Sequence, residues 1–416
     1  MREVEIVSLG CRLNAFEGEA MSRLAAAAGL RDVVVVNSCA VTGEAVRQTR
    51  QAIRRARRGK PGAKVVVTGC AAQIDPGSFA AMSEVDAVLG NAEKLDVNEW
   101  RALADGAALR VNDIFATRAA APQLIEAYGD RSRAFLQIQT GCDHRCTFCI
   151  IPYGRGPSRS TPAAAVAAAA GRLVAEGHAE IVLTGVDITS WGADFDPPSS
   201  LGRLVGRVLD ETPGLKRLRL SSIDGAEIDA ELFERVVFDE RFAPHLHLSL
   251  QSGDDIILKR MKRRHARAQS VSLCAAIRAA RPEIAFGADL IAGFPTETGA
   301  MFERSLALIE DAGLNYVHVF PFSPREGTPA ALMPQLPGPT IKARSRRLRE
   351  AGAAALERFL DSLVGAAFDA VIEAGGRARL ANFAPAKLAA PIGAVGAIAK
   401  IRVIARDGAM LIAQAA

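Results

Sequence analysis

The chain has 416 residues, of which 49% are hydrophobic and 23% charged, and its formal net charge at pH 7 is +5. A chain of this length can form two or three domains with a sizeable core, and so small a net charge leaves any contact with a polyanion to local patches. Residues 1–10 lack the basic and long apolar segments of a signal peptide, and no window reaches the ~18 uninterrupted apolar residues of a membrane span. We therefore expect a cytoplasmic protein without a membrane partner.

Three strand-like runs open the chain, and a cysteine follows each of them. The runs and their cysteines are 4–10 with Cys11, 33–38 with Cys39, and 64–69 with Cys70. The segments between them, 15–28 and 45–58, have helical character, and alternating strand and helix predict a parallel sheet. Because ligands bind outside the carboxyl ends of such strands, the cysteines should converge at one edge. Each could be a small buried residue, but three equivalent positions favour a 4Fe-4S cluster with three ligands.

The stretch from about 91 to 130 mixes Pro, Gly, Ala and charges without periodicity, which predicts the end of a first domain and a linker. A short loop after it carries three cysteines in the spacing CxxxCxxC, at Cys142, Cys146 and Cys149. Three thiolates on a 4Fe-4S cubane leave one iron free for a further ligand. Zinc would need a fourth Cys or His ligand. The candidate His144 lies in the sequence between Cys142 and Cys146, which is a poor position for binding the same ion. The seventh cysteine, Cys274, has apolar neighbours at helical spacing and is predicted to pack in the core.

Strand and helix patterns then alternate as far as residue 320. The strand candidates are 134–139, 180–184, 217–221, 245–250, 284–291 and 316–320, and the helical segments are 163–176, 201–210, 227–238, 266–280 and 301–311. Six such units are too few for an eight-unit barrel but suit an open, partial one. Every strand ends in a polar or Gly-rich segment, as the mouth of a barrel that grips cofactor and substrate requires.

These motifs together resemble the methylthiotransferase family of radical SAM enzymes. The residues that carry the resemblance are 10–14 (GCRLN), 37–42 (NSCAVT), 68–73 (TGCAAQ), 141–156, 247–253 (HLSLQSG) and 259–261 (KRM). The resemblance covers the chain to about residue 360 and implies an α/β fold. Its parts would be an N-terminal parallel sheet domain at 1–115, a linker at 116–130, a partial (β/α)6 radical SAM barrel at 131–361 and a small, degenerate TRAM-like β domain at 362–416.

The resemblance also implies two 4Fe-4S clusters, an auxiliary one on Cys11, Cys39 and Cys70 and one on Cys142, Cys146 and Cys149 that cleaves S-adenosyl-L-methionine. The residues implied to seat this cofactor are Phe148, Gly185, Asp187, Ser222, Gln251, Gly293 and Pro295. Cleavage yields a carbon radical that opens an unactivated C–H bond, so positioning carries most of the catalysis. No catalytic residue beyond the cluster ligands is expected. The histidines His178, His245, His247, His265 and His318 are expected to be packing or surface residues.

Three substrate branches compete within this family: N6-threonylcarbamoyladenosine in tRNA, isopentenyladenosine in tRNA, and an aspartate of a ribosomal protein. The segments 10–17 and 147–156 look most like the first branch. An arginine fork could recognise the threonylcarbamoyl carboxylate, and Arg155 and Arg159 directly follow the cluster loop; contact with phosphate is the open alternative. A rival of another class is a non-catalytic iron–sulfur protein that binds RNA.

Three basic stretches favour an RNA partner. They are Arg47, Arg50, Arg54, Arg55, Arg57, Arg58 and Lys60; Lys259, Arg260, Lys262, Arg263 and Arg264; and Arg344, Arg346, Arg347 and Arg349. Such runs are often only solvated helix faces. A single-stranded tRNA anticodon stem-loop is the expected target, because carbon 2 of adenine is reachable only when the base leaves its stack. We expect a monomer that receives electrons from flavodoxin or ferredoxin.

Overall fold

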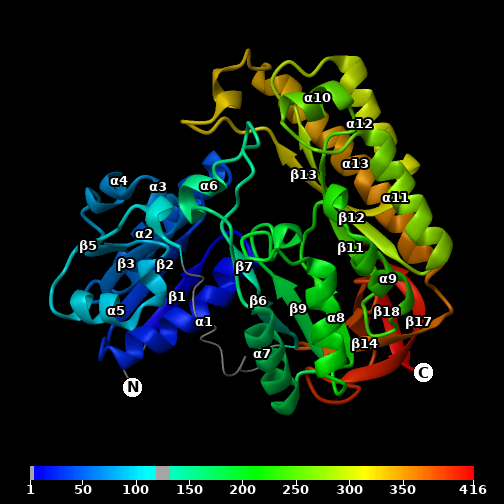
Figure 1. Cartoon of the computed structure of the whole chain (residues 1–416), viewed down its shortest axis with the longest axis horizontal. Coiled ribbons are helices and arrows are strands. Elements are labelled where there is room, and N and C mark those ends of the chain that lie inside the picture. The colour runs from blue at the N-terminus through cyan, green and yellow to red at the C-terminus, as the bar shows by residue number, and fades with distance from the viewer. Residues whose placement is uncertain (1–3, 119–131) are drawn as a thin grey trace. The chain divides into compact units, whose positions relative to one another are not determined.

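The computed structural model describes residues 4–118 and 132–416, and Figure 1 shows its helices and strands. The chain forms two compact units. The first consists of the described residues within 1–125 together with 139–161 and 323–331, and the second holds the remainder. The predicted linker at 116–130 lies almost wholly outside the described residues, and the predicted division at 115, 131 and 361 stays a prediction.

The first unit contains a parallel five-stranded sheet in the order β1-β2-β3-β4-β5. Its strands are β1 (Val4–Ser8), β2 (Val33–Ser38), β3 (Lys64–Gly69), β4 (Ala87–Leu89) and β5 (Leu109–Arg110). The helices between them are α1 (Arg12–Ala27), α2 (Gly43–Gly59), α3 (Cys70–Ile74), α4 (Pro76–Ala80) and α5 (Val97–Ala104). All six residues of β2 are buried, as expected of a parallel strand covered on both faces. The predicted α/β fold and its first three strands are confirmed.

The cluster loop also belongs to the first unit. A short antiparallel pair, β7 (Gln139–Thr140) and β8 (Arg159–Ser160), closes the base of the loop. The helix α6 (Ile151–Arg155) lies within it. The segment predicted as one strand at 134–139 is two strands with different partners: β6 (Ala134–Gln137), in the second unit, pairs in parallel with the strand at 180–184, whereas β7 pairs antiparallel with β8.

The second unit contains a partial barrel built from two parallel three-stranded sheets, in the orders β10-β9-β6 and β11-β12-β13, with a bridge between Ile223 and Leu248. The strands are β6 (Ala134–Gln137), β9 (Glu180–Thr184), β10 (Arg217–Leu220), β11 (His245–Gln251), β12 (Ala285–Ala292) and β13 (Leu314–Pro321). The helices are α7 (Ala163–Ala175), α8 (Leu201–Glu211), α9 (Ala230–Phe238), α10 (Asp255–Arg260), α11 (Arg267–Ala280), α12 (Gly299–Asp311) and α13 (Gly338–Ser362). The predicted six-strand partial barrel is confirmed.

A small closed β-barrel ends the second unit, as predicted for the tail. Its strands, in the order β14-β15-β16-β18-β17, are β14 (Ala367–Glu373), β15 (Arg377–Leu380), β16 (Pro385–Leu388), β17 (Ile398–Asp407) and β18 (Met410–Ala415). Buried arginines attach it to the parallel strands: Arg217 and Arg219 pair with Glu180 and donate to the carbonyls of Asp369 and Ala381. Within the described part of the chain, no helix is long and apolar enough to cross a bilayer.

Candidate functional site

The first unit brings Cys11, Cys39 and Cys70 together at the carboxyl ends of β1, β2 and β3. Cys11 precedes the first residue of α1, and Cys70 begins α3. Gly10 lies so close to Cys39 that a Cβ at residue 10 would stand 2.6 Å from the Cys39 sulfur. Burial raises the pKa of the Cys39 thiol to about 11. Three thiols at one sheet edge can ligate one metal cluster; that they do so stays a prediction.

A buried polar network lies directly against these cysteines. Glu17 accepts from Lys94 at 2.6 Å and forms a second ion pair with Arg155, and all three side chains are at most 4% exposed. Arg155 also donates through Nε to the Cys70 sulfur at 3.2 Å and through Nη2 to Asn14 Oδ1 at 2.7 Å. Burial alone would raise the pKa of Glu17, but Arg155 and Lys94 outweigh burial and hold this pKa below its usual value.

The charges of this network do not balance by themselves. One carboxylate, Glu17, faces two cations, Lys94 and Arg155, and a buried charge without a partner costs several kcal/mol. An anionic thiolate cluster on Cys70 and its neighbours would supply the missing negative charge. Asn91 Nδ2 also lies 3.6 Å from the Cys70 sulfur, and hydrogen bonds to sulfur tune iron–sulfur clusters. The residues present therefore fit an iron–sulfur group.

The second set of cysteines, Cys142, Cys146 and Cys149, is half-buried on a loop that hydrogen bonds hold in shape. Gly141 has φ +76°, and a Cβ there would stand 1.8 Å from the Pro157 carbonyl oxygen, so only glycine fits. The Cys142 N–H donates to Gly156 at 3.1 Å, and the Ala330 N–H donates to Thr147 at 2.9 Å. The loop thus presents three thiols from a fixed backbone.

The second unit gathers most of the residues predicted to seat S-adenosyl-L-methionine at one end of its strands. Gly185 and Asp187 follow β9, Ser222 follows β10, Gln251 ends β11, and Gly293 and Pro295 follow β12. Gln251 has φ +66°, a costly conformation for a residue other than glycine and one that clusters at functional sites. Glu297 accepts from the Gly293 N–H at 3.1 Å and pairs with Arg344 of α13 at 2.7 Å, which fixes this turn. Phe148 lies in the cluster loop of the first unit.

The two arginines predicted to contact substrate differ in their surroundings. Every nitrogen of Arg155 already donates, to Glu17, Asn14 or Cys70. Arg159 is 7% exposed, and only its Nη2 has a partner, the Arg155 carbonyl oxygen at 3.0 Å. Its Nε and Nη1 are buried without an acceptor among the described residues. Since a buried guanidinium without a counter-charge is costly, Arg159 fits an anionic ligand and Arg155 fits the auxiliary cluster.

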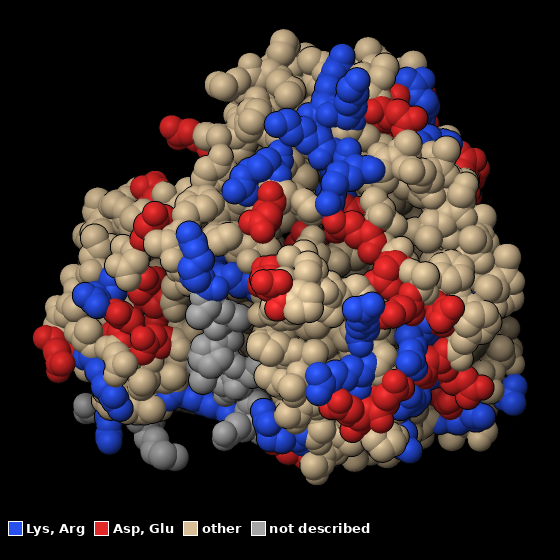
Figure 2. All heavy atoms as spheres, in the orientation of Figure 1, with Lys and Arg blue, Asp and Glu red and all other residues tan. Residues whose placement is uncertain are grey.

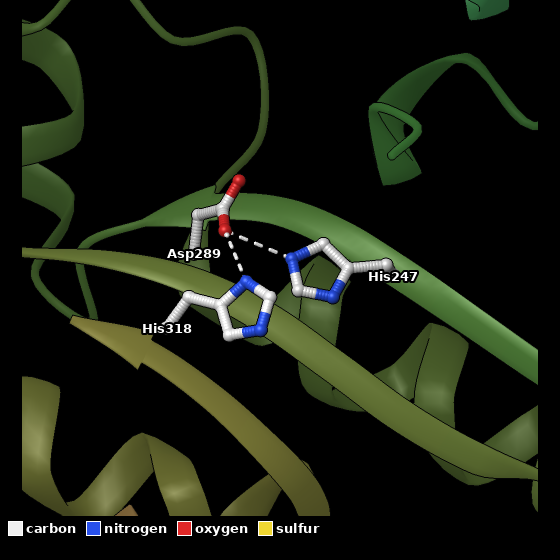
Figure 3. Close-up of side chains that lie close together, drawn as sticks. All are labelled: His247, Asp289 and His318. Carbon is white, nitrogen blue, oxygen red and sulfur yellow. Dashed lines mark hydrogen bonds and ion pairs between the residues drawn. The ribbon is translucent and has the colours of Figure 1, made fainter. Parts of the chain in front are cut away.

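A cluster of His247, Asp289 and His318 was not expected from the sequence. These residues come from the adjacent strands β11, β12 and β13 and point toward one another (Figure 3). Asp289 Oδ1 lies 2.9 Å from His247 Nε2 and 3.4 Å from His318 Nδ1. Burial would raise the pKa of Asp289, but hydrogen bonds from both histidines lower it to about 2. His245 and His265 are buried.

The predicted basic stretches are largely neutralised by acidic neighbours. On α2 and its exit, Arg47 pairs with Glu44 and Lys60 pairs with Glu5. Arg263 and Arg264 pair with Asp224 and Glu227, and Arg347 pairs with Glu303. Figure 2 shows Lys and Arg gathered near α10 with acidic side chains beside them. The exposed cations in this stretch are Lys259, Arg260, Lys262 and Arg264.

Comparison with protein families identifies two regions. Residues 136–309 match the Radical SAM superfamily, and residues 3–90 match the Uncharacterized protein family UPF0004. The first match covers the cluster loop and the partial barrel up to α12, and the second covers Cys11, Cys39 and Cys70.

Several known proteins are similar to the chain over most of its length. The threonylcarbamoyladenosine tRNA methylthiotransferase MtaB of Rickettsia prowazekii is 50% identical over 92% of this chain and 91% of that protein, and its Bacillus subtilis namesake is 36% identical over 80% and 76%. A tRNA-2-methylthio-N(6)-dimethylallyladenosine synthase of Cereibacter sphaeroides is 36% identical over 84% and 82%. The solved structure of the radical S-adenosylmethionine methyltransferase TsrM from Kitasatospora setae shares the fold, with a TM-score of 0.55 at 16% identity over 77% and 68%.

Proposed function

The chain belongs to the radical SAM methylthiotransferase family, and we propose that it modifies N6-threonylcarbamoyladenosine beside the anticodon of tRNA. The reaction places a methylthio group on carbon 2 of the adenine and consumes two molecules of S-adenosyl-L-methionine. The observation that carries the substrate is the 50% identity, across nine-tenths of both chains, with a relative that bears this name. The relative named for the dimethylallyl substrate is 36% identical.

The iron–sulfur and S-adenosyl-L-methionine chemistry follows from the family, and we propose two clusters. One would be held by Cys142, Cys146 and Cys149 on the cluster loop, where it would supply the electron that cleaves S-adenosyl-L-methionine. The other would be held by Cys11, Cys39 and Cys70. The unbalanced positive charge of Arg155 and Lys94 beside Cys70 supports the second cluster, because it calls for an anion at that place.

We further propose that the strand-end residues of the second unit seat S-adenosyl-L-methionine. These are Gly185, Asp187, Ser222, Gln251, Gly293 and Pro295, joined by Phe148 of the cluster loop. Their support is position, since ligands of parallel barrels bind at the carboxyl ends of the strands. The partners would be a tRNA anticodon stem-loop and a cytoplasmic reductant such as flavodoxin or ferredoxin, with the enzyme acting as a monomer.

The function is tested by mass spectrometry of tRNA nucleosides from a strain that lacks the gene. We expect the methylthio form of threonylcarbamoyladenosine to be absent there, with the unmethylthiolated nucleoside accumulating in its place. The chain supplied on a plasmid should restore it, as should the variant Cys274→Ala, whose cysteine is buried in the core. Persistence of the methylthio form would contradict the proposal, and loss of methylthiolated isopentenyladenosine instead would assign the other tRNA branch.

Arg159 is proposed to bind an anion of the substrate, either the threonylcarbamoyl carboxylate or a phosphate. Arg159→Gln should weaken binding of an anticodon stem-loop about ten- to a hundredfold, because a hydrogen bond between charged groups contributes about 1.5–3 kcal/mol. Fluorescence anisotropy under anaerobic conditions measures this, with the exposed Arg145→Gln of the same loop as the matched control. An equal loss on stem-loops with and without the threonylcarbamoyl group would indicate phosphate. Unchanged binding would remove Arg159 from the site.

A further inference from the structure

The cluster of His247, Asp289 and His318 faces the concave side of the partial barrel. On β12, Phe286 lies under Arg278 of α11, with 4.9 Å from the guanidinium carbon to the ring centre. On β13, Val317 lies against Gly352 of α13, where a Cβ would be 2.9 Å from it. Because successive side chains of a strand point to opposite faces, Asp289 and His318 point away from these helices.

His247 lies on the same face as Asp289. In the parallel register His247 lies opposite Gly287 of β12, and its ring passes over Gly287 to contact Asp289. A Cβ at residue 287 would stand only 2.4 Å from His247 Nδ1. The missing side chain of Gly287 thus leaves the space in which the His247 ring lies. All three residues of the cluster therefore lie on the face of the strands that points away from α11 and α13.

On the amino-terminal side of this cluster, aromatic side chains pack against one another and occupy the space on the same face of the strands. His245 of β11 stacks on Phe383 of the small C-terminal barrel at 4.7 Å and meets Tyr316 of β13 at 5.6 Å. Each of these two strand residues precedes its partner in the cluster by two positions, so it lies one layer deeper on the same face. The His318 side chain, in contrast, is 61% exposed. The cluster thus forms a polar floor directly above the end of the barrel that the aromatic side chains fill. The polar atoms of this floor are accessible from the side of the carboxyl ends of the strands.

Asp289 orients the exposed ring of His318 so that one of its nitrogens remains available to a ligand. Both histidines approach the same Asp289 oxygen, His247 with Nε2 and His318 with Nδ1, so Nδ1–H of His318 donates to Asp289 and its Nε2 stands outside this contact. In the neutral ring this Nε2 accepts a hydrogen bond, and in the imidazolium it donates one. The floor can therefore pair with a group that carries both N–H donors and a carboxylate.

We propose that His318, held by Asp289, binds the polar threonylcarbamoyl group on N6 of the target adenosine. This proposal rests on the proposed function. Asp289 precedes Gly293 by four residues, and a strand rises about 3.3 Å per residue, so the floor lies about 13 Å below that strand-end turn. If carbon 2 of the adenine is held at the carboxyl ends of the strands, the base itself does not extend to the floor. Only a long substituent on N6 can extend toward it. An isopentenyl group would leave the polar floor unpaired, which is costly, so the floor selects the polar branch.

The test uses the anaerobically reconstituted chain and three anticodon stem-loops that differ only at the target base: adenosine, threonylcarbamoyladenosine and isopentenyladenosine. Dissociation constants by anisotropy give the ratio of affinities between the modified and plain adenosine. His318→Asn keeps an amide N–H where Nδ1–H stood but removes the outer nitrogen. The ratio for the threonylcarbamoyl stem-loop should fall about tenfold or more, with binding of the plain stem-loop unchanged. His178→Asn, in the turn between α7 and β9, is the matched control.

The possible results separate this proposal from the proposed function. If the wild type prefers and methylthiolates the threonylcarbamoyl stem-loop while His318→Asn keeps the full preference, His318 does not recognise the substituent and only this proposal fails. An equal loss on all three stem-loops would assign a structural role and also overturn it. Methylthiolation of only the isopentenyl stem-loop by the wild type would overturn both. Two histidines and a carboxylate can also bind a divalent metal, so a stoichiometric ion in a variant lacking the six cluster cysteines, lost in His318→Asn, would overturn the proposal as well.

Discussion

Replacing Cys11, Cys39 and Cys70 together by alanine is expected to separate two activities of the protein. The variant should still convert S-adenosyl-L-methionine to 5′-deoxyadenosine, because the other three cysteines lie on a separate segment of the chain, 139–160, and are unchanged. It should form no methylthio product at all. Its iron content should fall from about eight to about four per chain, since each 4Fe-4S cluster contributes four. Anaerobic iron analysis and chromatography of both products measure the three quantities on one preparation.

The complementary variant Cys142→Ala should abolish 5′-deoxyadenosine formation and methylthiolation together while keeping about four irons. Cys274→Ala is the matched control, because Cys274 is a buried residue of α11 whose thiol pKa is raised to about 12 by burial, and it should change neither iron nor activity. Iron content that stays constant in the triple variant would show that Cys11, Cys39 and Cys70 hold no cluster. Loss of all iron in that variant would show that the two sites are not independent.

The sequence alone located the strands that carry these cysteines, because buried parallel strands are continuous apolar runs. Strands β2 and β3 begin and end where the Val-rich runs do, at 33–38 and 64–69. Topology then determined which residues would meet, since the carboxyl ends of neighbouring parallel strands lie at one edge. Helix α13, which spans 25 residues, is not among the helices predicted from the sequence, because its closely spaced arginines are typical of a charged surface stretch as well as of a helix.

The strand and helix pattern does not predict which side chains contact one another. The position of Arg155 directly after the cluster cysteines predicts a contact with substrate, which stays a prediction, but gives no sign of its ion pair with Glu17, 138 positions away. The pair of His247 and Asp289 depends on strand register and on the space above Gly287. The spacing of His245 and His247 predicts that both rings lie on one face of their strand. The same spacing does not predict that the carboxylate of Asp289 lies beside them on the neighbouring strand.

The variant Glu17→Gln is expected to lower the stability of the first unit by about 3–5 kcal/mol, the typical cost of leaving a buried charge unpaired. Glu17 is the one carboxylate between Lys94 and Arg155 within the described network, and all three are buried. Neutralising it leaves two cations facing each other. Urea unfolding of the metal-free chain measures the loss. Trp100 reports on this unit alone in a Trp191→Phe background, because the chain has only these two tryptophans and Trp100 donates to the Lys94 carbonyl.

The variant Arg155→Gln should lower the stability of the metal-free chain far less than Glu17→Gln does, because it removes the surplus cation instead of the single carboxylate. Glu17 and Lys94 remain as a balanced ion pair in this variant. The auxiliary cluster would lose its counter-charge and the N–H donor to Cys70, so iron at that site should be released faster to a chelator. Arg47→Gln on the surface of α2 is the control and should alter neither property. If Arg155→Gln destabilises the metal-free chain as strongly as Glu17→Gln does, Arg155 acts as a packing and hydrogen-bonding residue, and the surplus cation is not held for a cluster.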